Sequence, residues 1–143
     1  MSIATDIRAY LLTQAAMTTL SSTRMYCHKR DQGSALPALV LSLESEDHGH
    51  HLTAASGWAM ARLSIDSVAS TYVSAAAIDE QVRQELSGFN GTIGTSSTLV
   101  TSVVLDNRAE RFVDPIDGSD VGVFVISSDY MVQYAESVPT LST

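Results

Sequence analysis

The highest concentration of metal-binding side chains lies in residues 44–51, ESEDHGHH, which hold three of the four histidines together with three carboxylates. Imidazole and carboxylate groups are zinc ligands. Because side chains alternate along an extended chain, Glu46, His48 and His50 would share one side. No cysteine lies nearby and no helical H-x-x-x-H spacing is present. We therefore predict no metal site and no cofactor, and keep a small metal-dependent enzyme using the His48/His50 loop as an alternative.

Two alternating segments flank this cluster and must position it. In residues 38–44, leucines recur at every second position, and in residues 58–69 Ala61, Leu63 and Ile65 alternate with polar residues. Period-two alternation is typical of half-buried strands. The polar stretch between them, residues 44–57, is therefore predicted to be a long mobile hairpin loop that contacts another protein. The predicted contact residues are Glu46, Asp47, His48, His50, His51, Leu52 and Trp58.

The remaining elements follow from the same reading. A helical stripe begins at Thr5, with Thr5-Asp6 as its predicted cap and Ile3 outside it, and residues 15–20 add a weaker turn. Residues 71–87 give the clearest helix, and residues 89–97 are predicted to be loop. The apolar stripe of that helix is Ala75, Ile78, Val82, Leu86 and Phe89. Residues 99–112 and 121–135 are predicted strands. The side chains expected to share one face are Leu99, Thr101, Val103 and Leu105 in the first strand and Phe124, Ile126, Tyr130, Val132 and Tyr134 in the second. The predicted fold is α+β: two helices packed on one mixed or antiparallel β-sheet with a long hairpin loop. It occupies one domain, residues 1–136, followed by a flexible C-terminal tail, residues 137–143.

Composition argues against several classes of partner. The net charge is −8, and the basic residues are scattered apart from the Lys29-Arg30 pair, so there is no basic patch for nucleic acid. No apolar run approaches the ~20 residues that span a bilayer, and the N-terminal residues do not read as a secretory signal. We expect a soluble protein that is made in the cytoplasm and is not exported by a signal sequence. Its single cysteine, Cys27, is predicted to be a half-buried, passive thiol.

No set of residues predicts catalysis. The segment GFNGTIG follows a helix and lacks the lysine of a phosphate-binding loop. The acids between Asp106 and Asp120 lack the spacing of a calcium loop. We therefore expect a protein that is not an enzyme.

The order of the elements resembles the tail completion, or tail terminator, proteins of long-tailed bacteriophages. The resemblance rests on IATDIRAYLL (3–12), LPALVL (36–41), SGWAMARLSID (56–66), GFNG (88–91) and YMVQY (130–134). The chain departs from these proteins at Met25-Tyr26-Cys27, where they often carry Tyr-Pro after the arginine, and at Ser67-Val68, where they often carry an aromatic residue.

The resemblance implies a non-enzymatic structural virion protein. It would form a ring, commonly a homohexamer, that caps the tail tube, ends tail polymerisation and docks the head-tail connector (stopper) protein. Its partners would be further copies of itself, the tail tube protein and that connector, with DNA passing through the ring without specific binding and no membrane contact. Its location would be the tail neck, at the head-proximal end of the tail. Another head-tail connector or minor tail protein of similar fold remains an alternative.

Overall fold

The computed structural model describes residues 3–21, 24–28, 36–50, 55–94, 98–113 and 122–135. None of the helices in these segments is long and apolar enough to cross a membrane. The elements, in chain order, are α1 (Ile3–Leu12), α2 (Ala15–Ser21), β1 (Met25–Cys27), β2 (Ala38–His50), β3 (Ala55–Ala69), α3 (Tyr72–Leu86), β4 (Gly91–Ile93), β5 (Thr98–Val113) and β6 (Val123–Ala135).

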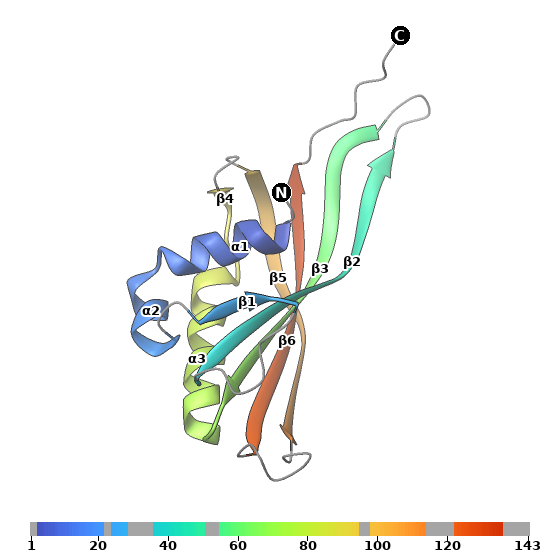
Figure 1. Cartoon of the computed structure of the whole chain (residues 1–143). Coiled ribbons are helices and arrows are strands. Elements are labelled where there is room, and N and C mark those ends of the chain that lie inside the picture. The colour runs from blue at the N-terminus through green and yellow to red at the C-terminus, as the bar shows by residue number, and fades with distance from the viewer. Residues whose placement is uncertain are drawn as a thin grey trace.

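The strands form one mixed sheet in the order β1-β2-β3-β6-β5-β4. β1 pairs with β2 in parallel, and every other pairing is antiparallel. β6, the last strand in the chain, lies between β3 and β5, so the connection from β3 through α3 to β5 spans the position that β6 fills. Figure 1 shows the sheet strongly curled, with the helices on one side and the β2–β3 hairpin extending beyond them.

This architecture corrects the predicted fold class. The molecule is α+β only in the broad sense: it is mostly strand, with three helices and a curled six-stranded sheet. The prediction of two helices on a sheet with a long hairpin loop is wrong. The segment from Ala15, expected to be a weak turn, is a separate helix that contacts α1 and α3, so tertiary packing stabilises a helix too short to persist alone.

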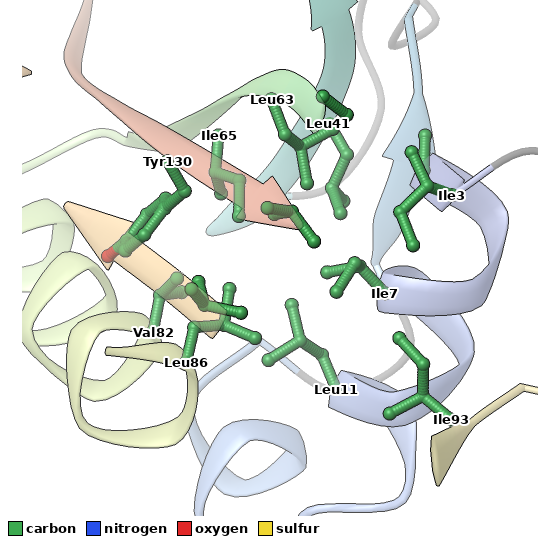
Figure 2. Packing of buried hydrophobic residues seen from close by; sticks show 14 of the residues in the cluster. Ile3, Ile7, Leu11, Leu41, Leu63, Ile65, Val82, Leu86, Ile93 and Tyr130 are labelled. Atoms are coloured by element: carbon green, nitrogen blue, oxygen red, sulfur yellow. The ribbon is translucent and has the colours of Figure 1, made fainter. Parts of the chain in front are cut away.

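The core lies between the helices and the inner face of the sheet. α1 buries Ile3, Ile7 and Leu11, which are spaced four residues apart and therefore share one face. α3 buries the predicted stripe at Ile78, Val82 and Leu86, and the predicted alternating residues of β3 are also buried. Figure 2 shows the labelled side chains of α1, α3 and β3 converging with Leu41, Tyr130 and Ile93.

The ends of α3 match the prediction because each has a local cause. Thr71, in extended conformation, accepts a hydrogen bond from the Ser74 amide at its hydroxyl (3.3 Å), which satisfies one free donor of the first turn. After the cap Ser87, Gly88 adopts a φ of +80°, which side chains with a Cβ disfavour.

The predicted loop over residues 44–57 is also wrong. β2 continues to His50 and β3 begins at Ala55, so the hairpin strands carry most of that stretch. Residues 44–50 read as loop because they are polar on both faces, but their pairing with β3 keeps them extended. Residues 51–54 and the predicted tail, residues 137–143, lie outside the described residues.

Three smaller predictions are corrected as well. α1 begins at Ile3, so Thr5 does not cap it. Residues 91–93 of the predicted loop form β4. In β5, a register shift between Val100 and Ser102 turns Leu99 outward and buries Val100 with Val103. A β-bulge of this kind reverses the alternation and cannot be read from a period-two pattern.

Candidate assembly surface

The predicted contact residues that the structure describes, Glu46, Asp47, His48, His50 and Trp58, lie on the distal half of the β2–β3 hairpin. Glu46, Asp47 and His48 pair with Ala61, Met60 and Ala59 of β3. Side chains directly opposite each other in a sheet point to the same face. Since Ala59 and Ala61 are buried against the core, Glu46 and His48 project on the inner side of the hairpin and Asp47 on the outer side.

The histidine cluster does not form a ligand set in the described part of the chain. His48 Nε2 lies 4.0 Å from Glu46 Oε2, a loose contact between partly exposed groups. A register shift between His48 and His50 interrupts the alternation that would have aligned them. No three His, Cys, Asp or Glu side chains converge among the described residues. His51 and Leu52 lie outside those residues, so the metal alternative stays a prediction without a test.

Trp58 is the aromatic residue of this hairpin. It pairs with Ala135 at the end of β6, and its side chain is 41% exposed. The structure therefore places Trp58 on the same hairpin as the acidic stretch of β2, as the sequence predicted.

Four polar side chains join α3 to the inner face of the sheet. Asp79 is buried, accepts a hydrogen bond at Oδ1 from Ser128 Oγ (2.5 Å) and pairs at Oδ2 with Arg108 Nε (2.7 Å). Arg108 also donates to Glu110 Oε1 at 3.1 Å. The hydrogen bond to Asp79 is the main cause that raises the pKa of Arg108. Both oxygens of the buried carboxylate therefore have partners, as burial of a charge requires.

Tyr130 lies fully buried near this cluster. Burial, and next the negative charge of Asp79, raise the pKa of its phenol well above the ordinary range. Its hydroxyl has no hydrogen-bond partner among the described residues. The tyrosine therefore stays neutral and contributes mainly by filling the core.

An apolar cleft of about 200 Å³ lies at the far end of the sheet from the hairpin, lined by Tyr72, Glu110, Arg111, Phe112, Phe124 and Ile126. The rings of Phe112 and Phe124 are 4.9 Å apart. The hydroxyl of Tyr72 is hydrogen-bonded to Glu110, and this bond is the largest cause that lowers the pKa of the Glu110 carboxyl. The lining offers aromatic contact surface without a paired nucleophile and base.

The outer face of the sheet carries a second charge cluster. Arg62 of β3 reaches Asp106 Oδ2 at 2.7 Å and Asp129 Oδ2 at 2.9 Å. These two hydrogen bonds are the main causes that raise the pKa of Arg62. The cluster ties β3, β6 and β5 together at the register shift between Leu105 and Asn107.

Sequence reasoning missed the contribution of β5 to the surface. The large hydrophobic side chains that are exposed in the described residues are Trp58, Tyr72, Val73, Leu99, Val104, Phe112 and Val113. Four of these seven belong to β5, whereas the sequence predicted contact only at the hairpin. The available signal was the pair Phe112-Val113, because two adjacent apolar residues cannot both face the core of an alternating strand.

The structure is similar to a solved chain of the "Virion of native gene transfer agent (GTA) particle", with a TM-score of 0.69 and 17% identity over 94% of this chain and 95% of that chain. The two chains share a fold. No protein-family model and no curated protein sequence matches this chain.

The described surface has three prominent features. They are an extended hairpin, exposed apolar side chains spread along β5 from Leu99 to Val113, and long strand edges without a described neighbour. An unpaired strand edge is a template for pairing with another chain.

Proposed function

We propose that this protein is a structural protein of a phage-like virion. It would act without catalysis and without a cofactor, as a tail terminator: a ring of copies, commonly six, that caps the tail tube and ends its polymerisation. The observation that carries this proposal is the shared fold with a chain of a gene transfer agent virion, over almost all of both chains.

Two features of the molecule support assembly over an independent role. The sheet has long edges that a neighbouring subunit can extend. The net charge of −8 would repel the phosphates of DNA within roughly 8 Å, so DNA could pass a ring of such subunits without binding. In this proposal the hairpin residues, including Glu46, His48 and Trp58, contact the tail tube or the head-tail connector at the tail neck.

The experiment is removal of the gene from a cell that produces the particle, followed by negative-stain microscopy of the tails. A terminator predicts tails of uncontrolled length that fail to join heads, with uniform length restored by the wild-type gene. Tails of normal length without heads would contradict termination and favour another connector of the same fold. Normal particles would contradict a structural role.

A further inference from the structure

Two of the long strands lack a described neighbour along much of their outer edge. Among the described residues, β1 pairs with Leu39, Val40 and Leu41, and residues 42–50 of β2 pair with β3 alone. In the same described segments, β4 pairs with residues 98–100, and residues 101–113 of β5 pair with β6 alone. Figure 1 shows β4 beside the upper end of β5 and the hairpin half of β2 extending past the helices. An edge of this length is a template for pairing with another chain.

The directions of the strands permit two copies to join by these edges. β2, β3, β6 and β5 alternate in direction, because each neighbouring pair is antiparallel. The first and last of these four strands, β2 and β5, therefore run in opposite directions. When a copy is rotated about an axis roughly along the strands, its β2 keeps its direction and meets β5 of the first copy in antiparallel orientation. A repeat of four alternating strands can therefore continue from copy to copy without breaking the pattern.

The short outer strands determine the offset between such copies. Within one subunit, Ser45 is level with Val104, through its pairing with Arg62 and the pairing of Arg62 with Met131. If neighbouring copies met at this level, β4 of one would lie against the upper end of β2 of the next. Shifting the neighbour so that its Ser45 faces Ala109 brings the two free edges together instead.

This offset has the size that sheet closure requires. The shift from Val104 to Ala109 is four positions along the sheet, because Val104 pairs with Met131 and Ala109 with Ser127 across the bulge in β5. This is about 13 Å at ~3.3 Å per residue, and four strands are about 19 Å wide at ~4.8 Å each. The ratio corresponds to a strand tilt of about 35°, at the lower end of the roughly 35–45° typical of closed barrels. The offset that β1 and β4 impose on each pair of subunits is therefore compatible with a closed sheet. This argument uses the offset per subunit and holds for any number of subunits in the ring.

The faces of the two edges also match at this offset. The free edge of β2 is acidic: it carries Glu44, Glu46 and Asp47 and no lysine or arginine. The free edge of β5 carries Arg108 and Arg111 together with the acids Asp106 and Glu110, so its charges balance. Arg62 binds Asp106 at 2.7 Å, and Asp79 binds Arg108 at 2.7 Å.

With Ser45 facing Ala109, both side chains lie on the outer face, because they pair within the subunit with Arg62 and Ser127. Glu46 then faces Arg108 on the inner face. Opposite charges at directly facing positions stabilise a strand pair. Arg108 would share this contact with Asp79 and Glu110 of its own subunit, and Glu44 would lie opposite Glu110, a like-charged pair that opposes the gain.

We propose that residues 42–50 of β2 in one copy pair in antiparallel orientation with residues 101–113 of β5 in the next copy, with Ser45 facing Ala109. The inference rests on the proposed ring and identifies the surfaces that close it. It also accounts for the exposed side chains of Val104, Phe112 and Val113 on β5, which the neighbouring hairpin flanks after assembly.

The experiment is disulfide cross-linking of the full chain, in a background where Cys27→Ser removes the native thiol. Ser45→Cys and Ala109→Cys are introduced together, the protein is allowed to assemble, and it is oxidised and run on a non-reducing gel. Facing residues of adjacent strands bring their Cβ atoms within about 5 Å, close to the separation that a disulfide needs. We expect a ladder of covalent multimers up to the full ring, containing most of the protein.

Matched controls define the register and the type of contact. Ser45→Cys with Val104→Cys joins the residues that would meet without the offset, and should give at least tenfold less cross-linked product. Each single cysteine variant should give no dimer, whereas a mixture of the two single variants should give dimer and nothing larger.

Native mass spectrometry and tail-length measurements separate the two proposals. Rings that form without the ladder would overturn this interface and leave the terminator function standing. A ladder from a protein whose removal does not change tail length would support the interface and overturn the function. Dimers from either single variant would overturn the interface by showing that identical edges pair, and protein that neither assembles nor cross-links would overturn it too.

Discussion

At the scale of residues, Asp79 shows how one buried carboxylate ties a helix to a sheet. Its two oxygens contact Ser128 of β6 and Arg108 of β5, so a single side chain of α3 joins two strands. Burial of a charge is favourable only when its hydrogen bonds are made. The cluster therefore stabilises α3 on the sheet and fixes its orientation.

Replacing Arg108 with Met should lower the free energy of unfolding by about 2 kcal/mol, because Asp79 loses a charge-assisted hydrogen bond while the side-chain stem is kept. Urea denaturation of the monomer followed by circular dichroism measures this change. The control is Arg83→Met, which removes an exposed pair with Glu80 and should cost less than about 1 kcal/mol. Equal losses in the two variants would show that Asp79 does not depend on Arg108.

The pKa of Glu110 tests the contact with Tyr72. Since the pKa is lowered in the folded state, ionised Glu110 favours folding above its unfolded pKa, and this contribution is lost as the pH falls through the folded pKa. Tyr72→Phe should raise the pKa of Glu110 toward its ordinary value, and the variant should therefore lose less stability as the pH falls. Carboxyl NMR titration measures the shift. Tyr10→Phe, at the other end of α3 near Glu85, should leave it unchanged.

At the scale of elements, the turn between β4 and β5 is fitted to α1. Gly94 has a φ of +77°, and a Cβ added there would collide with the carboxylate of Asp6. Asp6 is buried in the first turn of α1 and accepts a hydrogen bond from Thr98 Oγ1 at 2.8 Å. The turn, the first helix and the start of β5 are therefore packed as one unit.

Two glycine variants separate backbone strain from this packing. Gly88 has a similar φ of +80°, but no atom lies within 4 Å of an added Cβ. Gly88→Ala should therefore cost about 1 kcal/mol, the penalty of a left-handed conformation. Gly94→Ala should cost a further 1–3 kcal/mol or so, because it also overpacks Asp6. Thermal unfolding measures both, and equal shifts in melting temperature would contradict the close packing of the turn.

At the scale of the whole molecule, the strands should differ in how strongly their backbone amides are protected from hydrogen exchange. β6 is paired on both sides along nearly its entire length, whereas the outer edges of β2 and β5 lack a described neighbour over residues 42–50 and 101–113. Backbone groups with few buried contacts exchange through small local openings. The stable centre of the molecule is therefore the β3–β6 pair, and its edges are the parts that assembly can change.

Hydrogen exchange should detect this change. In the monomer, amides of β6 should exchange slowest and those of the two free edges fastest. On assembly, the edges should become at least tenfold more protected, while the amides of β6, already paired, serve as the internal control. Mass spectrometry of peptides from monomer and assembled protein measures both. Unchanged exchange at both edges in the assembled state would contradict edge pairing.

The sequence by itself determined the elements whose periodicity records burial. α3 and the inward residues of β3 and β6 were predicted well, because a continuous apolar face has a regular spacing. Glu46 to His48 and Trp58 do lie on the paired strands β2 and β3, whereas their contact with another protein stays a prediction.

Only the tertiary structure decided the rest. Residues 44–50 are extended because β3 pairs with them, although their polar side chains resemble a loop. The bulge that turns Leu99 outward, the short outer strands and the resulting free edges depend on strands distant in the chain. Hydrogen bonding between strands depends on the backbone, whereas a single sequence records mainly which side chains are buried. The surfaces proposed to close the ring are therefore visible only once the sheet order is known.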